Sequence, residues 1–281
     1  MLLHIGAADW QTTAWLNGQW VGRHQGGYLP FQFELTPYLQ TGENELVIAV
    51  WDPTDTHWQA RGKQVLHPRS IWYTAISGIW QTVWLEAVPQ TYLAGLKITP
   101  ELDSGSVLVQ AQLDGPEAAL LPIQITVLEQ GIPVASGAGT SGQALRLAIP
   151  DPHPWSPGDP YLYDLVVQAG NDRVESYFGI RKFSLGHDAQ GRVRLCLNNQ
   201  PLFQYGPLDQ GYWPDGLYTA PTDEALRFDL EFCKRSGVNL VRKHVKVEPL
   251  RWYYHCDRLG LIVWQDMPNG GRPVGTVTTL L

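Results

Sequence analysis

Residues 201–268 read PLFQYGPLDQGYWPDGLYTAPTDEALRFDLEFCKRSGVNLVRKHVKVEPLRWYYHCDRLGLIVWQDMP, and this stretch decides the fold of the C-terminal part of the chain. Three short apolar runs, PLFQYG, NLVRKHV and LIVWQDMP, alternate with two segments of helical periodicity. Such alternation is typical of parallel strands that are joined by helical crossovers. We therefore predict a β-α-β-α-β arrangement, the opening of a (β/α)8 barrel.

Both helical segments carry boundary signals. The first begins after Thr222, a favourable N-cap that two acidic residues follow, and it stops before Gly237. The second has Pro249 in its first turn and ends at Gly260. Helical spacing predicts one apolar face per helix, formed by Leu226, Leu230 and Cys233 and by Leu250, Tyr253 and Tyr254.

The composition indicates a globular, mildly acidic protein. The chain has 281 residues, of which 44% are hydrophobic and 17% charged, and its net charge is −7. Without basic blocks it is a poor candidate for nucleic-acid or anionic-membrane binding, and no apolar run approaches the ~18 residues of a membrane span. The opening MLLHIGAADW lacks the basic segment of a signal peptide and reads as a strand within a domain, so the localisation stays unknown.

Residues 1–89 are rich in strand patterns without an intervening helix. Alternating apolar residues mark five strands, in MLLHIGAA, TAWLNGQWVG, FQFEL, ELVIAVWD and WQTVWLEAV. Asn17-Gly18 is a strong two-residue hairpin signal. We expect an antiparallel sandwich with an open edge, since a jelly roll needs about eight strands.

Residues 90–185 contain seven short strand candidates that are separated by turns rich in Gly, Pro and Asp. Seven strands in a segment of this length fit an immunoglobulin-like β-sandwich. The candidates lie at 92–99, 107–113, 123–129, 132–137, 144–149, 162–168 and 174–183.

Several phrases carry a family resemblance. PLFQYG, LVRKHV and RWYYHCDRLGLIVWQDMP resemble the start of the catalytic barrel in glycoside hydrolase family two, the β-galactosidases, β-glucuronidases and β-mannosidases. WLNG, GGYLPFQFELT and SGIWQTVWLE resemble the jelly-roll sugar-binding domain of that family, and PWSPGDPYLYDL its immunoglobulin-like domain. The resemblance implies a partial jelly roll at 1–89, an immunoglobulin-like sandwich at 90–185 and the first part of the catalytic barrel at 186–281.

The family hydrolyses O-glycosyl bonds with retention and uses two glutamates, which follow the fourth and the seventh barrel strand. A barrel takes about 250 residues, and here the pattern stops after the third strand. The resemblance therefore implies a fragment that is truncated at both ends, inactive alone, with the missing remainder of the enzyme as a partner. Two alternatives stay open: a non-catalytic carbohydrate-binding module and a scaffold piece that folds only with a complementing chain.

Candidate substrate-binding residues follow the predicted barrel strands, where barrel active sites lie. Arg242 matches the family's arginine on the second strand, near the nucleophile, although it could be a structural ion pair. His244 points to the same side and could donate to a sugar hydroxyl or to a buried neighbour. Asp266 ends the third strand, where it could position a catalytic group or cap the backbone.

The loop after the first strand supplies the remaining candidates. Asp209 and Asp215 flank Trp213, and carboxylates beside an aromatic ring make a plausible sugar subsite. The same residues, with Pro and Gly beside Asp, are also common in turns that bind no ligand. The polar loop at 52–64 could reach the barrel mouth. The family's asparagine-arginine-histidine loop is replaced here by LDQGYWPDG, so the sugar cannot be inferred.

No other chemistry is indicated. The sequence shows no metal-ligand spacing, phosphate loop or nucleophilic triad, and we expect neither a metal nor a cofactor. Cys196, Cys233 and Cys256 are odd in number and lack paired spacing, so we expect reduced thiols.

Overall fold

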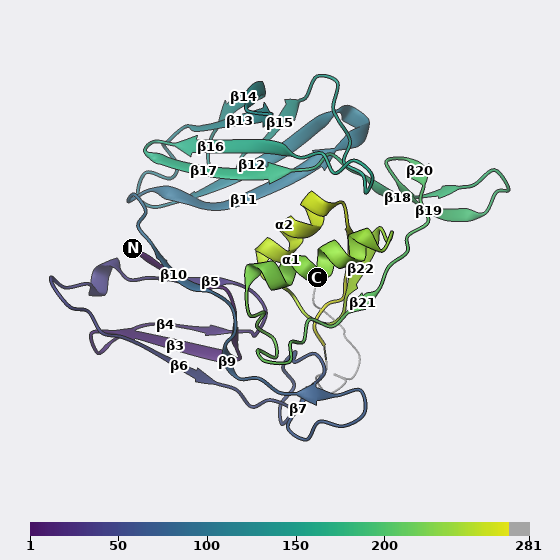
Figure 1. Ribbon diagram of the computed structural model, residues 1–281. Helices are drawn as coiled ribbons and strands as arrows, with labels where there is room; N and C mark the ends of the chain where they lie inside the picture. The colour runs from purple at the N-terminus through teal and green to yellow at the C-terminus, as the bar shows by residue number, and fades with distance from the viewer. Residues whose placement is uncertain (270–281) are drawn as a thin grey trace.

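The computed structural model describes residues 1–269 and contains two β-sandwiches followed by a β-α-β-α-β segment (Figure 1). The part of the predicted third domain that runs from 270 to 281 lies outside the described residues. Within the described part, no helix is long and apolar enough to span a membrane.

The N-terminal sandwich is built from two three-stranded antiparallel sheets, ordered β10-β1-β5 and β4-β3-β6, with two small strand pairs beside them. Asn17 and Gly18 have φ values of 53° and 76°, which confirms the predicted hairpin between β3 and β4. A short 3-10 turn, η1, covers Thr36–Tyr38. The strands are β1 (Leu2–Ile5), β2 (Ala8–Asp9), β3 (Gln11–Leu16), β4 (Gln19–Gln25), β5 (Phe31–Glu34), β6 (Leu46–Trp51), β7 (Gln64–Val65), β8 (Tyr73–Thr74), β9 (Gly78–Ile79) and β10 (Val83–Glu86).

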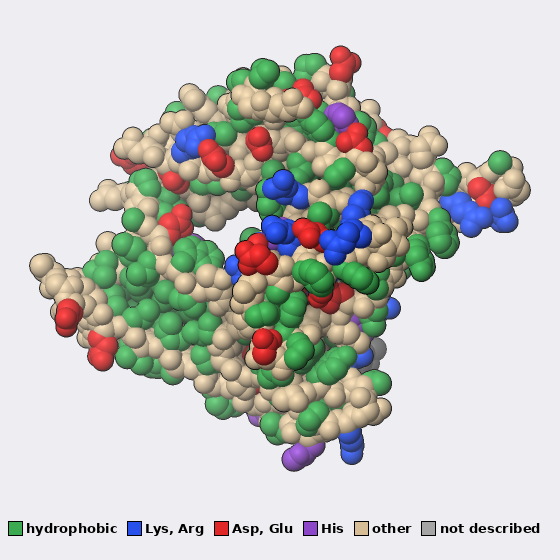
Figure 2. Space-filling view, viewed as in Figure 1, with side chains coloured by type: hydrophobic (Ala, Val, Ile, Leu, Met, Phe, Trp, Pro, Cys, Tyr) green, Lys and Arg blue, Asp and Glu red, His purple; other side chains and the backbone are tan. Residues whose placement is uncertain are grey.

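This sandwich exposes apolar side chains along β6 and β10. Trp51 is 50% exposed and Leu85 59% exposed, and Val47 and Trp84 are similarly open. Figure 2 shows hydrophobic side chains gathered over the region where these sheets lie. The exposure agrees with the open edge that the strand count predicted.

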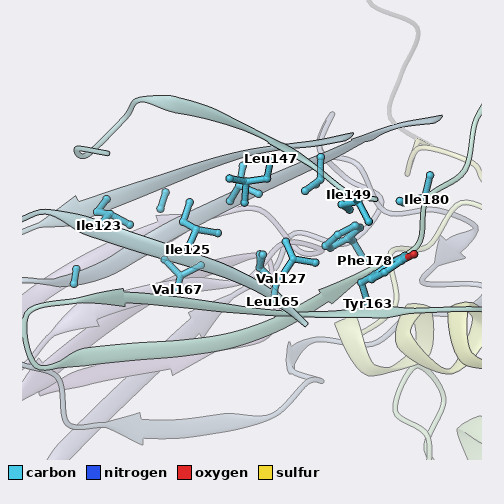
Figure 3. Packing of buried hydrophobic residues seen from close by; sticks show 14 of the residues in the cluster. Ile123, Ile125, Val127, Leu147, Ile149, Tyr163, Leu165, Val167, Phe178 and Ile180 are labelled. Atoms are coloured by element: carbon cyan, nitrogen blue, oxygen red, sulfur yellow. The ribbon is translucent and has the colours of Figure 1, made fainter. Parts of the chain in front are cut away.

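The second sandwich packs a three-stranded sheet, β11-β12-β15, against a four-stranded sheet, β14-β13-β16-β17. Its core is formed by the inward-facing residues of both sheets, among them Ile125, Val127, Leu165 and Phe178 (Figure 3). A 3-10 turn, η2, covers Leu102–Ser104. The strands are β11 (Tyr92–Glu101), β12 (Ser106–Asp114), β13 (Ile123–Glu129), β14 (Ile132–Gly139), β15 (Ala144–Ala148), β16 (Tyr163–Ala169) and β17 (Asp172–Phe178).

All seven strands predicted for this sandwich are present, with one difference at the end. The last predicted strand ran to residue 183, whereas β17 ends at Phe178. A separate three-stranded antiparallel sheet follows, and its first strand crosses the predicted boundary at 185/186. Its strands are β18 (Phe183–His187), β19 (Val193–Leu197) and β20 (Gln200–Pro201).

The C-terminal segment is a parallel sheet of three strands, β21 (Leu208–Asp209), β22 (Leu240–Lys243) and β23 (Ile262–Gln265). Helices α1 (Asp223–Arg235) and α2 (Leu250–Leu259) connect the strands, as predicted. The Thr222 side chain accepts a hydrogen bond from the backbone N–H of Ala225 and caps α1. Gly260 ends α2 with a φ of 75°.

The first strand of this sheet pairs later in the chain than expected. We predicted residues 201–206, but the ladder to β22 forms only at Leu208–Asp209. The amide of Asn239 instead bonds the carbonyl of Phe203 and the N–H of Tyr205, both at 2.9 Å. These side-chain bonds, together with the backbone N–H of Asn239 that donates to the carbonyl of Tyr205 at 3.0 Å, join this stretch to the sheet before Pro207, which has no N–H to donate.

The predicted apolar face of α2 was wrong in two of its three residues. Leu250 is 78% exposed, whereas Trp252 and Cys256 are buried against the sheet and α1. Each helical residue turns the side chain by about 100°, so Leu250 lies on the side of α2 opposite Trp252. Tyr254 faces the second sandwich and contacts the ring of Tyr177.

Trp155 joins the second sandwich to the C-terminal segment. Its side chain is fully buried, and its indole N–H donates to the carbonyl of Asp257 in α2 at 2.7 Å. The guanidinium of Arg181 lies 4.5 Å above the indole ring and also pairs with the Asp257 carboxylate at 2.6 Å. One buried aromatic ring therefore fixes α2 against this sandwich.

We predict that Trp155→Ala lowers the free energy of unfolding by about 3–5 kcal/mol, because it leaves a large cavity between the two parts. Guanidinium denaturation measures the change. Leu120→Ala, at a side chain that is 79% exposed, serves as the control and should stay within about 0.5 kcal/mol of wild type. A loss below about 1 kcal/mol for Trp155→Ala would contradict this role.

Candidate functional site

Three of the predicted site residues meet at the carboxyl ends of the parallel strands. The guanidinium of Arg242 binds the carboxylate of Asp266 in a bidentate pair, with Nε 3.1 Å from Oδ1 and Nη2 2.9 Å from Oδ2. The side chain of Arg242 is 48% exposed, so it can contact a ligand while it holds Asp266. In this geometry two N–H groups of the planar guanidinium donate in parallel to the two oxygens of the carboxylate.

His244 completes this group. Its Nδ1 lies 3.2 Å from Oε1 of Gln210, and its Nε2 lies 3.8 Å from Oδ2 of Asp266. Burial and then the nearby Lys63 cation lower the pKa of His244, although Asp266 opposes them. A neutral imidazole in this place can exchange hydrogen bonds with sugar hydroxyls.

Asp209 and Trp213 lie outside this group. Asp209 places Oδ2 at 2.7 Å from Nζ of Lys243, and its Oδ1 accepts from the N–H of Gly211 at 2.8 Å. Trp213 packs against the apolar core between the helices and the sheet, and its backbone pairs with Leu217. Both placements favour the turn interpretation, and sugar contact by these two residues stays a prediction.

The most strongly buried charges of the site were missed by our sequence reasoning. Lys243, Lys246 and Glu248 are 1%, 0% and 4% exposed. Oε1 of Glu248 lies 2.8 Å from Nζ of Lys243 and 3.0 Å from Nζ of Lys246. We call these three residues, together with the partly buried Asp209 that pairs with Lys243, the buried charge cluster.

The two lysines of the buried charge cluster have different surroundings. Burial alone would lower the pKa of Lys243, but the carboxylates of Glu248 and Asp209 raise it above its ordinary value. Burial lowers the pKa of Lys246 to about 8, against the opposing effect of Glu248. Lys246 also donates to the carbonyls of Gly211 and Tyr218, at 2.7 and 2.8 Å. It therefore holds the loop after β21 in place.

Comparison with known proteins places this arrangement in a family. Residues 1–89 match the sugar binding domain of glycosyl hydrolases family 2, and residues 91–181 match a second domain of glycosyl hydrolases family 2. The chain belongs to glycoside hydrolase family 2. The N-terminal sandwich is its sugar-binding domain, and the second sandwich is its immunoglobulin-like domain.

The family 2 relatives are longer than this chain. It is 31% identical over 275 residues to a β-galactosidase of Klebsiella pneumoniae (strain 342), covering 89% of this chain and 25% of the relative. A β-galactosidase of Pseudoalteromonas haloplanktis is 29% identical and is covered to 26% of its length. The chain thus spans about a quarter of these relatives and corresponds to their N-terminal portion.

Solved structures of two β-glucuronidases show the same fold. A β-D-glucuronidase of Dictyoglomus thermophilum superposes with a TM-score of 0.80 at 22% identity, covering 98% of this chain and 49% of that one. A β-glucuronidase of Bacteroides uniformis gives 0.79 at 25% identity, covering 95% and 34%.

The sugar-binding domain docks directly against the candidate site. Trp80 of this domain lies under Lys246, with 5.2 Å between Nζ and the ring, and its carbonyl accepts from Oγ1 of Thr219 at 2.8 Å. The polar loop at 52–64 reaches the segment that follows β23, where the N–H groups of Arg61 and Gly62 donate to the carbonyl of Asn269 at 3.0 and 2.6 Å. Contact of this loop with a barrel mouth stays a prediction.

Asp9 is a further buried acid near this contact. It is 3% exposed, its Oδ2 accepts from Gln64 at 3.2 Å, and its Oδ1 has no hydrogen-bond partner among the described residues. Burial and then the charge of Asp52 raise the pKa of Asp9 to about 7. Gly27 packs so closely that a Cβ there would lie 2.6 Å from Oδ1 of Asp9, which excludes a larger residue.

We predict that Lys243→Met lowers the free energy of unfolding by about 3–5 kcal/mol, because it removes the cation that lies between the buried Glu248 and the partly buried Asp209. Thermal and urea unfolding measure the change. Lys97→Met, at an exposed lysine of β11, is the matched control and should be nearly neutral. Equal effects of the two substitutions would show that the cluster does not stabilise the fold.

We predict that Asp9→Asn stabilises the protein in a pH-dependent way. Well below its unfolded pKa of 3.8 the acid is neutral in both the folded and the unfolded state, so the substitution changes little. Between its unfolded pKa of 3.8 and its folded pKa of about 7 the folded state keeps the proton longer, so wild type loses stability as the pH rises. The advantage of Asp9→Asn should grow to at most roughly 4 kcal/mol near pH 8.

The measurement is the difference in unfolding free energy between the Asp9→Asn variant and wild type, at intervals from pH 4 to pH 8. A difference that does not vary over this range would contradict the buried, protonated state of Asp9.

Proposed function

We propose that this chain forms the substrate-positioning part of a retaining family 2 glycoside hydrolase, which hydrolyses O-glycosyl bonds in carbohydrates. The observation that carries the proposal is the bidentate pair of Arg242 and Asp266, with His244 beside it, at the carboxyl ends of parallel strands. A sugar-binding domain lies against the same loops. In this proposal, β21, β22 and β23 are the first three strands of a (β/α)8 barrel, and the N-terminal sandwich is part of a jelly roll.

Arg242 would act on the nucleophile of the reaction. A guanidinium beside a glutamate favours the ionised carboxylate that must attack the anomeric carbon. Asp266 orients Arg242 through its two bonds, and His244 offers a neutral imidazole to a sugar hydroxyl. The three side chains would thus hold the anomeric carbon of the substrate in position for attack by the nucleophile.

The two catalytic glutamates are assigned to later barrel strands, the fourth and the seventh, by resemblance to the family. The described residues contain three parallel strands in this segment, and Asp209 and Asp266 are each engaged with a cation. Neither carboxylate is free to serve as a proton donor opposite a nucleophile. We therefore propose that these 281 residues bind sugar without turnover, and that the remainder of the same enzyme is their partner.

A second candidate function is a carbohydrate-binding module without catalysis. The same observation supports it: a half-exposed Arg242 beside a sugar-binding domain can hold a sugar without any glutamate pair. The two proposals differ in the polypeptide that follows residue 281. Barrel strands that carry glutamates at the fourth and seventh positions support the enzyme, and their absence from the coding sequence supports the module.

We predict that the purified chain binds a β-linked disaccharide such as lactose with a Kd in the millimolar range and does not hydrolyse p-nitrophenyl β-D-galactoside or β-D-glucuronide. Arg242→Ala should weaken binding about tenfold, because it removes charged hydrogen bonds and releases Asp266. Isothermal titration calorimetry and release of p-nitrophenol are the two measurements.

Arg235→Ala, an exposed arginine on α1, controls for the loss of surface charge and should leave the affinity unchanged. Hydrolysis by the purified chain, at a rate that Arg242→Ala abolishes, would contradict the assignment of catalysis to later strands. Absence of binding to any β-galactoside, β-glucoside, β-glucuronide or β-mannoside would contradict both candidate functions.

A further inference from the structure

A groove of about 590 Å³ lies between the immunoglobulin-like domain and α2. Figure 1 shows α2 beneath β16 and β17, and residues of all three elements line the groove. The lining comes from the later turns of α2, Tyr254 and Arg258, whereas Arg242, His244 and Asp266 follow or end β22 and β23. Because α2 returns along the sheet between these parallel strands, its last turn lies toward their amino ends. The groove is therefore separate from the candidate site.

The alternation of side chains along the strands shows which residues of the sandwich face the groove. Arg173, Glu175 and Tyr177 are spaced by two along β17 and point to the outer face of the sheet. Asp164 of β16 pairs directly with Tyr177 and shares this face. The opposite side of the groove is one turn of α2, where Tyr254 and Arg258 are four residues apart.

Contacts between the two domains fix both sides of the groove. The rings of Tyr177 and Tyr254 meet edge to face with centroids 4.9 Å apart. The hydroxyl of Tyr177 donates to the carboxylate of Asp257 at 3.2 Å, and the guanidinium of Arg258 lies 5.7 Å from the ring of Tyr254. A cleft whose two sides are held by such contacts is largely pre-formed, which lowers the entropy lost on binding.

The lining favours a ligand with many hydroxyl groups. Arg173 and Glu175 form an ion pair on the outer face of β17, and Asp164 and Arg258 add one charge of each sign, so the formal charges of these four side chains cancel. Such a groove does not select an anion, which argues against nucleic acid and acidic polymers. It offers planar donors and acceptors beside tyrosine rings and apolar side chains, which suit the hydroxyls and the C–H face of a pyranose.

We propose that this groove binds a neutral oligosaccharide, as a second carbohydrate site on the family 2 chain. A site away from the strand ends would hold a polymeric substrate to the protein and raise its local concentration at the site of Arg242. The inference does not depend on the proposed function, since a non-catalytic module would bind the same ligand.

The test uses the 281-residue chain and four neutral trisaccharides: cellotriose, xylotriose, mannotriose and galactotriose. Saturation-transfer NMR detects binding, and calorimetry gives the affinity. We expect at least one trisaccharide to bind with a millimolar Kd. The double variant Arg173→Ala/Arg258→Ala should weaken this affinity about tenfold, because it removes charged hydrogen-bond donors from both sides of the groove.

Arg235→Ala is the matched control. Arg235 lies in the last turn of α1, as Arg258 lies in the last turn of α2, and its guanidinium lies 5.9 Å from the ring of Phe228. If the double variant unfolds, the two single variants replace it, since both guanidinium groups are on exposed residues.

Two results would overturn the second site. The second site is ruled out if no trisaccharide binds. It is also ruled out if Arg242→Ala weakens the binding of a trisaccharide while the double variant binds it as tightly as wild type. The latter result would still support the proposed function, because the sugar would then bind at the strand ends. Loss of affinity in the double variant, with Arg242→Ala unchanged, supports the groove alone.

Discussion

The hydrogen-bonded ion pairs of Glu248 with Lys243 and Lys246 are the constraint on which the rest of the structure depends. All three side chains are withdrawn from water, where isolated charges would be very unfavourable. Such charges persist only when partners surround them, and here Asp209, two backbone carbonyls and three aromatic rings do so. Every segment that supplies a partner is thereby fixed relative to β22.

This constraint links the fold to the candidate site. Along β22 the side chains alternate, so Lys243 lies with Trp252 on the helix side while Arg242 and His244 face the opposite side. Val245 follows with a φ of 47°, a strained value for a β-branched residue, between His244 and the buried Lys246. Lys246 then reaches Trp80 of the sugar-binding domain. The lysines that shape the loop therefore also dock this domain beside Arg242.

Much of the fold could be predicted from the sequence because its signals are local. The Thr222 cap, the Asn17-Gly18 turn and the alternating strands of the immunoglobulin-like domain depend on neighbouring residues, and the structure contains them. The meeting of Arg242 and Asp266 was also predictable, since parallel strands end at one edge. The partner of Asp209 was not, because Lys243 lies 34 residues away and its burial depends on Glu248 and Trp252. One signal in the sequence could have indicated that Lys243 is paired. Side chains alternate along a strand, so Lys243 lies on the opposite face from Arg242, which is the face that the helices cover. A charged side chain on that face needs a partner of opposite charge.

The most direct test of the account is a crystal structure of the chain grown with lactose at a concentration well above its Kd. The account predicts a sugar ring whose hydroxyls lie within hydrogen-bond distance of Arg242 or His244, with the bidentate pair of Arg242 and Asp266 intact. A structure in which lactose binds only elsewhere, or in which Arg242 and Asp266 are apart and Lys243 is exposed to solvent, would contradict it.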